Sequence, residues 1–127
     1  MKKKIMIIAM MIALLITNKV KADEVILHKA WATAYSIHGT TATNTETIEG
    51  QTLASKPEWF GCTAIVWLDD GDGVIKPANY IGTYTVEDTG GKNIRNGSVI
   101  DIYISNWDEA VKFGSKRVIM QIVKAEG

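Results

Sequence analysis

From residue 25 onward, the chain is a succession of short strand-forming runs, and this pattern limits its folds more than any other feature. Each run is rich in Val, Ile, Thr, Tyr or Trp, and each ends at Gly, Pro, Asn or Asp. Residues of the first group favour strands and those of the second favour turns. Six short strands with one helical segment among them predict a small closed barrel of the all-β class rather than a layered α/β fold. The runs are residues 25–35, 52–55, 62–68, 80–87, 98–104 and 116–123.

The single predicted helix covers Trp107–Phe113. Asn106 precedes it as the N-cap, and Glu109 follows at the position that completes a capping box. Gly114 ends the helix, as glycine often does.

The N-terminus has the composition of a secretory signal peptide. Three lysines follow Met1, and residues 5–16 form an unbroken apolar run of 12 residues. A bilayer span needs about 20 apolar residues, whereas a signal-peptide core is shorter. We therefore expect residues 1–22 to be a signal peptide and residues 23–127 to be one domain, secreted or held in the cell envelope. An uncleaved N-terminal anchor is the alternative.

Charge and cysteine content narrow the class of protein further. Cleavage after Ala22 removes five lysines and no acid, which leaves nine basic and 14 acidic side chains and a net charge of −5. A mildly acidic domain is a poor candidate for binding nucleic acid. The one cysteine, Cys62, cannot form an internal disulfide, so the hydrophobic core must hold the fold. We expect a monomer with no stable membrane insertion once the leader is removed.

No cofactor or metal site is predicted. His28 and His38 have no further ligand at metal-binding spacing. The run Asp69–Gly73 alternates Asp and Gly as calcium loops do, but an EF-hand loop needs a closing Glu at its twelfth position. Counting from Asp69 places Tyr80 there, so the run is interpreted as a hairpin turn.

Two aspartates next to strand-forming residues stand out. Asp101 lies inside the run Val99–Ile104, on the face opposite three isoleucines. A carboxylate is unfavourable in a strand interior, which indicates a role beyond folding. Asp88 lies where the preceding run ends, and period-two alternation places it on the same face as Val86.

Two carboxylates in different environments can cleave a glycosidic bond. One is kept neutral by apolar surroundings and donates a proton, while the other is ionised and stabilises the oxocarbenium-like transition state. Asp101 is the candidate acid, because Val99 and Tyr103 flank it on its own face, and Asp88 is the candidate charged partner. Each also has a structural interpretation, Asp88 as a turn residue and Asp101 as an edge-strand charge that resists aggregation.

The segment 86–103, V-E-D-T-G-G-K-N-I-R-N-G-S-V-I-D-I-Y, and the helix end Ala110–Gly114 resemble the three-aspartate (3D) domain. Members of that family are similar to the catalytic part of membrane-bound lytic transglycosylase A. Looser matches at Thr33–Tyr35 and Gly50–Ala54 extend the resemblance over nearly all of the domain. The resemblance implies a double-psi β-barrel, which is a closed six-stranded barrel with two interlocked crossing loops.

The resemblance also implies activity on peptidoglycan glycan strands. In the transglycosylases an acid cleaves the bond between N-acetylmuramic acid and N-acetylglucosamine. The same group then acts as a base on the muramic C6 hydroxyl, which leaves a 1,6-anhydro ring without using water. Asp101 matches this acid, and Asp88 matches its supporting carboxylate.

The chain departs from the family pattern at Lys56, which stands before Pro57 where the family has its first aspartate. A cation there favours the ionised form of a nearby carboxylate, which helps a stabilising group and hinders an acid. Lys56 therefore favours an alternative function, a non-catalytic module that binds or loosens wall glycan as expansin-like proteins do. A partner-binding domain with no sugar role is a third hypothesis. The residues assigned to substrate binding are Lys56, Trp59, Tyr103 and Trp107.

Overall fold

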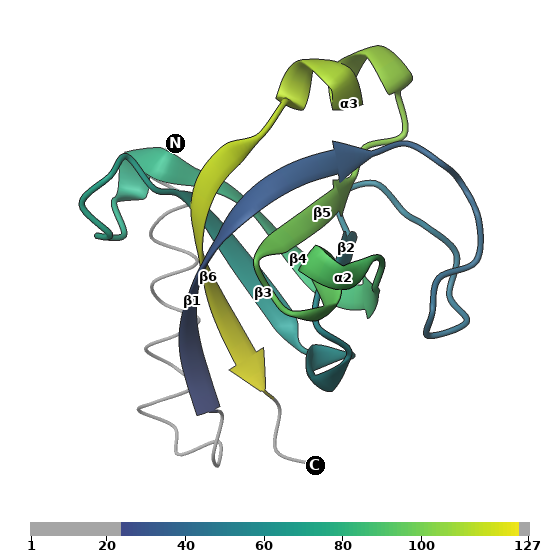
Figure 1. Cartoon of the computed structure of the whole chain (residues 1–127), viewed down its shortest axis with the longest axis horizontal. Helices are drawn as coiled ribbons and strands as arrows, with labels where there is room; N and C mark the ends of the chain where they lie inside the picture. Colours follow the sequence, from purple (N-terminus) through teal and green to yellow (C-terminus); the bar gives the residue numbers. More distant parts are fainter. Residues whose placement is uncertain (1–23, 125–127) are drawn as a thin grey trace.

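The structure, a computed structural model, describes residues 24–124. The predicted signal peptide lies outside these residues. Within them, six strands alternate with two short α-helices and two 3-10 turns (Figure 1). No helix among these residues is long and apolar enough to cross a bilayer. In chain order the elements are β1 (Glu24–Tyr35), β2 (Thr52–Ala54), η1 (Pro57–Trp59), β3 (Thr63–Leu68), η2 (Pro77–Asn79), β4 (Tyr80–Asp88), α2 (Lys92–Arg95), β5 (Val99–Tyr103), α3 (Trp107–Phe113) and β6 (Lys116–Lys124).

The six strands close into one barrel in the order β1-β5-β2-β4-β3-β6. β5 lies between β1 and β2, parallel to the first and antiparallel to the second. β2 in turn lies between β4 and β5, parallel to the first and antiparallel to the second. The connections from β1 to β2 and from β4 to β5 therefore each cross a strand that belongs to the other connection. This interlocked pair of crossings confirms the predicted double-psi barrel.

The barrel interior is filled by side chains from alternate positions of the strands. β1 contributes the small residues Ala30 and Ala32, which leave room for larger residues from the facing strands. The largest fully buried apolar side chains are Leu53, Ile100, Ile102, Met120, Ile122, Val66, Val86 and Val118. Because the interior faces are apolar, the polar residues of the same strands lie on the outside of the barrel, where the site is built.

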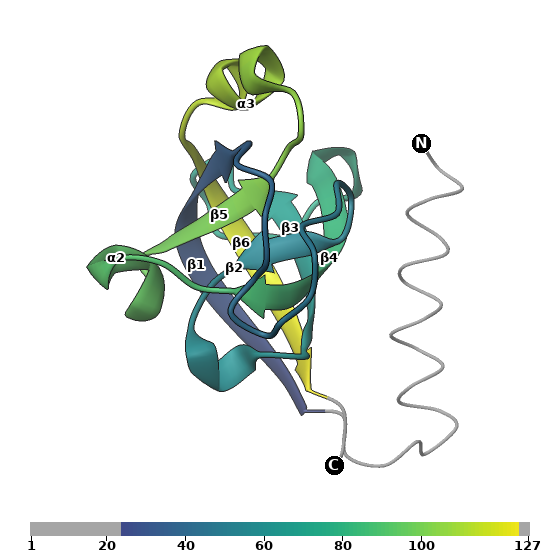
Figure 2. The ribbon, with the colours of Figure 1, turned by 90° about the vertical axis from the view of Figure 1, so that its right-hand side faces the viewer.

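The segment between β1 and β2, residues 36–51, crosses in front of the barrel (Figure 2). Its threonine hydroxyls bond one another, with Thr41 Oγ1 at 2.7 Å from Thr45 Oγ1 and 3.1 Å from Thr43 Oγ1. Thr43 N–H also donates to the Glu87 carbonyl oxygen at 3.2 Å, which ties the segment to the end of β4. The segment is therefore an ordered loop beside the site.

The predicted helix is confirmed as α3, with the predicted boundaries. Asn106 accepts a hydrogen bond from Glu109 N–H at 3.0 Å, and Gly114 follows the last residue with φ of 66°. The helix α2 was not expected from the sequence, and it forms a single turn after Gly91.

Asn106→Ala is expected to destabilise the protein by about 1 kcal/mol, because it removes the side-chain acceptor from the start of α3. The free energy of unfolding in urea measures this change. Ser115→Ala, just beyond the other end of α3, is the control and is expected to change it little. A loss of the same size in both variants would contradict the capping role.

Candidate functional site

A β-bulge at the end of β4 turns Asp88 to the outside of the barrel. Leu53 of β2 pairs with Val86, and both are fully buried in the interior. The next residue of β2, Ala54, pairs with Asp88, so Glu87 is an extra residue in β4. The prediction that Asp88 shares a face with Val86 is therefore wrong, because simple alternation takes no account of the inserted residue.

The extra residue of the bulge is anchored by hydrogen bonds. Glu87 is 7% exposed, and its carboxylate accepts from Thr52 Oγ1 at 2.8 Å and Gln51 Nε2 at 3.1 Å. A buried carboxylate needs such donors to offset its desolvation. Glu87 therefore holds the bulge that aims the neighbouring aspartate.

Asp88, Ala54 and Asp101 form one row across three neighbouring strands. Ala54 pairs with Asp88 on one side and with Asp101 on the other. Neighbouring strands lie about 4.8 Å apart, so the two aspartate Cα atoms are roughly 10 Å apart with only a methyl group between them. The row lies in a pocket of about 430 Å³, called here the Asp88–Asp101 pocket. Its lining residues are Tyr35, Ile37, Gly39, Thr40, Thr47, Ala54, Asp88, Thr89, Gly90, Gly91, Ile94 and Asp101.

Three donors hold the Asp88 carboxylate. Its Oδ1 accepts from Ala42 N–H at 3.1 Å and from Thr89 N–H at 3.0 Å, and its Oδ2 accepts from Tyr35 Oη at 3.2 Å. Burial, followed by the charge and hydrogen bond of Asp88, raises the pKa of Tyr35, so the phenol keeps its proton. Tyr103 packs edge-on against Tyr35, with the ring centroids 5.4 Å apart. Asp88 is thus a carboxylate held in a fixed orientation.

Asp101 has a different environment. It is partly buried, and one donor reaches it, Thr33 Oγ1 at 3.0 Å from Oδ1. Burial raises the pKa of Asp101, the Thr33 hydrogen bond offsets part of this effect, and the negative charge of Asp88 raises the pKa further. The pocket therefore pairs a carboxyl group that holds its proton more tightly with one that is oriented by three donors, which is the combination that acid catalysis requires.

The structure does not bring Lys56 to the two aspartates. Lys56 Nζ lies 3.2 Å from Glu58 Oε1 and 4.9 Å from the ring centroid of Trp59, and Lys56 does not line the pocket. The Lys56 side chain is therefore directed to Glu58 and Trp59 rather than to the pocket. Asp88 and Asp101 are the only acids among the described residues that line it.

The predicted sugar-binding aromatic residues also lie outside the pocket lining. Trp59 is 3% exposed and belongs to the barrel core, so neither face of its ring is open to a ligand. Tyr103 is 4% exposed and packs edge-on against Tyr35. Trp107 is 68% exposed at the start of α3. Of the residues assigned to the site from the sequence, Asp88 and Asp101 are brought together in the pocket.

Thr33 and Tyr35 contact the two aspartates, and neither was expected in the site. Two signals were available: alternation along β1 places both on its outer face, and the resemblance to the 3D domain extends over Thr33–Tyr35. Their partners depend on the parallel pairing of β1 with β5, in which Thr33 is opposite Asp101. The Tyr35 and Asp88 positions are 53 residues apart in the sequence, so no local pattern connects them.

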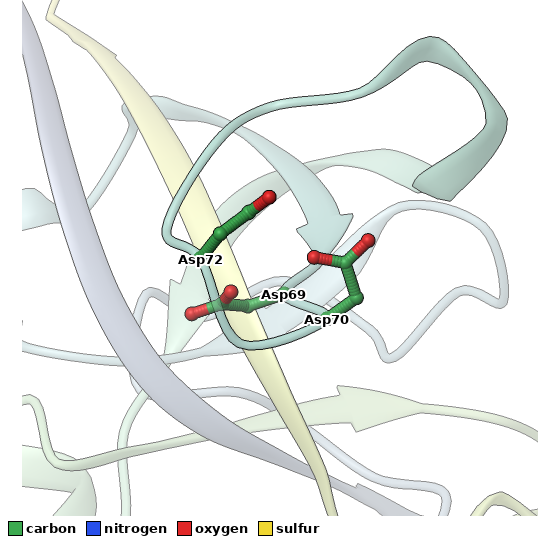
Figure 3. Close-up of side chains that lie close together, drawn as sticks. All are labelled: Asp69, Asp70 and Asp72. Carbon is green, nitrogen blue, oxygen red and sulfur yellow. The ribbon is translucent and has the colours of Figure 1, made fainter.

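The acidic loop after β3 is a separate feature. Asp69, Asp70 and Asp72 each offer a carboxylate oxygen, and these atoms lie within 4.8 Å of one another (Figure 3). Protein groups already engage them: Asp69 Oδ1 accepts from Gly71 N–H at 2.9 Å, and Lys76 Nζ lies 2.8 Å from Asp70 Oδ2 and 2.6 Å from Asp72 Oδ2. The loop joins the antiparallel strands β3 and β4, which confirms the predicted hairpin connection.

Comparison with solved structures identifies similar barrels. The crystal structure of MltA from E. coli aligns with a TM-score of 0.50 and 21% identity, covering 69% of this chain and 28% of that one. A variant of E. coli lytic transglycosylase MltA, with one aspartate replaced by alanine and in its apo-2 form, aligns with a TM-score of 0.51 and 19% identity, covering 70% of this chain and 28% of that one. No protein-family model and no curated protein matches the chain. The barrel predicted from the family resemblance is thus confirmed at the level of fold, over just over a quarter of the length of MltA.

Asp101→Asn is expected to stabilise the fold at neutral pH and to have little effect near pH 3. In the unfolded chain an aspartate has a pKa of about 3.9. Because the folded pKa is raised, ionisation of Asp101 removes stability as the pH rises from the unfolded value through the folded one. Asparagine does not ionise, and its Oδ1 still accepts from Thr33.

Urea denaturation of both proteins at a series of pH values measures this difference in the free energy of unfolding. Asp108→Asn, on the exposed surface of α3, is the control for a general effect of net charge. An Asp101→Asn difference that stays constant from about pH 3 to pH 7 would show that the carboxyl group is not perturbed in the fold.

Proposed function

We propose that this protein is a peptidoglycan-active enzyme of the lytic transglycosylase type, with Asp101 as acid and base and Asp88 as its charged partner. One observation carries the proposal: the two carboxyl groups line a single pocket on either side of Ala54, Asp88 with three hydrogen-bond donors and Asp101 partly buried with one. The likeness of the barrel to two lytic transglycosylase structures supports it at the level of fold.

The first step is proton donation. Asp101 enters the reaction protonated, which its raised pKa favours, and transfers its proton to the oxygen between N-acetylmuramic acid and N-acetylglucosamine. The bond from that oxygen to the muramic C1 breaks, and positive charge develops at C1 and the ring oxygen. The Asp88 carboxylate, already oriented by Tyr35, Ala42 and Thr89, stabilises this charge without reorganising.

The second step uses the same side chain in reverse. Asp101, now a carboxylate, removes the proton from the muramic C6 hydroxyl, and that oxygen forms the new bond to C1. The products are a free N-acetylglucosamine end and a 1,6-anhydromuramic ring, and Asp101 has regained its proton. No water is consumed, so the atoms and charges balance within the glycan and one carboxyl group.

The proposed function also requires that the protein leaves the cytoplasm. We infer that residues 1–22 direct the chain out of the cytoplasm and are removed, which brings residues 23–127 to the cell wall. The charged start and the apolar run of residues 5–16 support this inference.

A module that binds wall glycan without cleaving it is the second candidate. The observation that favours it is the position of Lys56, which replaces the family's first aspartate and pairs with Glu58 outside the pocket. In the catalytic proposal Asp101 takes part in cleaving the glycan, whereas in this alternative the glycan is bound beside Asp101 and stays intact.

The deciding experiment incubates residues 23–127 with purified peptidoglycan and analyses the products by mass spectrometry. The wild-type protein is expected to release 1,6-anhydromuropeptides, and Asp101→Asn is expected to reduce the rate by about 100-fold or more, the usual contribution of a general acid. Asp108→Asn is the control and keeps the wild-type rate. Retention on the wall without product release by the wild type would favour the binding module, and equal release by Asp101→Asn would overturn the catalytic assignment.

Ala54→Leu is expected to abolish product release. Ala54 lies between Asp88 and Asp101, lines the pocket and is 2% exposed, so the added carbon atoms fill the space that separates the two carboxyl groups. Circular dichroism checks the fold, and the peptidoglycan assay checks activity. A folded Ala54→Leu protein with undiminished release would show that the substrate does not enter between the two aspartates.

A further inference from the structure

We propose that a second hollow, on the outer face of β1 and β6, binds a carboxylate carried on a sugar. This inference extends the proposed function, because it concerns which glycans the protein recognises. The hollow has a volume of about 300 Å³ and is called here the Trp31 hollow. Its lining residues are Lys29, Ala30, Trp31, Asp69, Gly71, Ser98, Arg117 and Val118.

An arginine stacked on an exposed tryptophan is the central feature of the Trp31 hollow. Trp31 is 45% exposed, although a large apolar side chain is normally buried. The Arg117 guanidinium carbon lies 5.3 Å from the centroid of its ring. β1 and β6 are antiparallel, with Trp31 directly opposite Arg117, so the pairing of the strands fixes this stack. A guanidinium held in this way presents its N–H groups to a ligand with little loss of conformational entropy.

The net charge of the Trp31 hollow is positive. Lys29 and Arg117 each line it, and neither forms an ion pair with any residue between 24 and 124. The one acid in the lining, Asp69, turns its Oδ1 to the N–H groups of Gly71 at 2.9 Å and Gly73 at 3.1 Å. These two hydrogen bonds and the charge of Lys29 lower the pKa of Asp69, so Arg117 carries the excess positive charge of the hollow. An excess positive charge attracts an anion, and a planar guanidinium matches a carboxylate in particular.

The Trp31 hollow lies in line with the Asp88–Asp101 pocket. Trp31, Thr33 and Tyr35 are alternate residues of β1 and share its outer face. Thr33 donates to Asp101 and Tyr35 donates to Asp88. Trp31 is the outward-facing residue of β1 that comes just before Thr33. Asp101 is opposite Thr33, two residues along β1 from Trp31 and one strand to the side, which places its Cα atom roughly 8 Å from that of Trp31. Two neighbouring sugars of one glycan chain are long enough to span this separation. One continuous glycan chain can therefore occupy both sites.

The chemistry of the two sites fits an acidic glycan. An exposed aromatic face packs against a sugar ring, and the adjacent guanidinium binds a carboxylate by two parallel hydrogen bonds. In peptidoglycan, the muramic acid residue carries such a carboxylate, either on its lactyl group or on the attached peptide. The Trp31 hollow would thus favour glycans that contain muramic acid over neutral glycans built from N-acetylglucosamine alone.

The test measures binding in the Asp101→Asn background, so that no probe is cleaved. Three probes are titrated by NMR: the disaccharide of N-acetylglucosamine and N-acetylmuramic acid with a free lactyl carboxylate, the same disaccharide with a tripeptide on the lactyl group, and N,N′-diacetylchitobiose. At least one acidic probe is expected to bind about 10-fold more tightly than chitobiose, as a charge-assisted hydrogen bond provides. The acidic probe that does so identifies the source of the carboxylate. Arg117→Gln is expected to remove the preference, and Trp31→Ala to weaken all three probes.

Lys116→Gln is the matched control. It removes one positive charge from the residue of β6 that precedes Arg117. Lys116 Nζ lies 4.8 Å from the centroid of the Phe113 ring, and Lys116 does not line the Trp31 hollow. The preference for acidic probes is expected to survive in this variant. Equal binding of all three probes, or a preference that survives Arg117→Gln, would overturn the proposal. Because binding is measured without cleavage, a preference that depends on Arg117 stands even where wild-type protein cleaves no peptidoglycan, and that result would reject only the proposed catalysis.

Discussion

The register of β2 between β4 and β5 is the constraint on which the candidate site depends. Ala54 pairs with Asp88 on one side and Asp101 on the other, because β2 is an inner strand of the barrel with a neighbour on each side. The bulge at Glu87 then decides which way Asp88 points. A shift of one residue in either ladder would send a carboxylate into the apolar interior, where its desolvation is unfavourable. The core therefore enforces the geometry of the site.

The two carboxyl groups differ because their surroundings differ, not because their residue type does. Asp88 receives donors from three separate segments: the end of β1, the loop 36–51 and its own backbone neighbour. Asp101 receives one side-chain donor, is partly buried and faces the negative charge of Asp88, so its pKa is raised. A carboxyl group with a raised pKa beside a second carboxyl group is an arrangement found in acid–base pairs. The crossing connections of the barrel supply this asymmetry, since they carry the loop 36–51 to the end of β4.

The outer face of β1 links the two sites that we describe. In chain order, Trp31 lines the Trp31 hollow, Thr33 donates to Asp101 and Tyr35 donates to Asp88. The core imposes this order, because Ala30 and Ala32 must face inward and the intervening residues must then face outward. β1 thus aligns the positively charged Trp31 hollow with the two carboxyl groups of the pocket. A linear polymer is the ligand that matches such an arrangement.

The sequence by itself determined the class of fold, the six strands and the capped helix α3, and it singled out Asp88 and Asp101 beside strand-forming residues. These features follow from local rules: alternation within a strand, turn residues at its ends, and an N-cap and glycine around a short helix. The tertiary structure alone decided that Asp88 faces outward, that Thr33 and Tyr35 hold the carboxyl groups, that Trp59 and Tyr103 are buried, and that Lys56 turns away to Glu58. Each of these depends on which strands become neighbours and where a ladder gains a residue. Such contacts join positions far apart in the chain, and no local pattern of residue types encodes them.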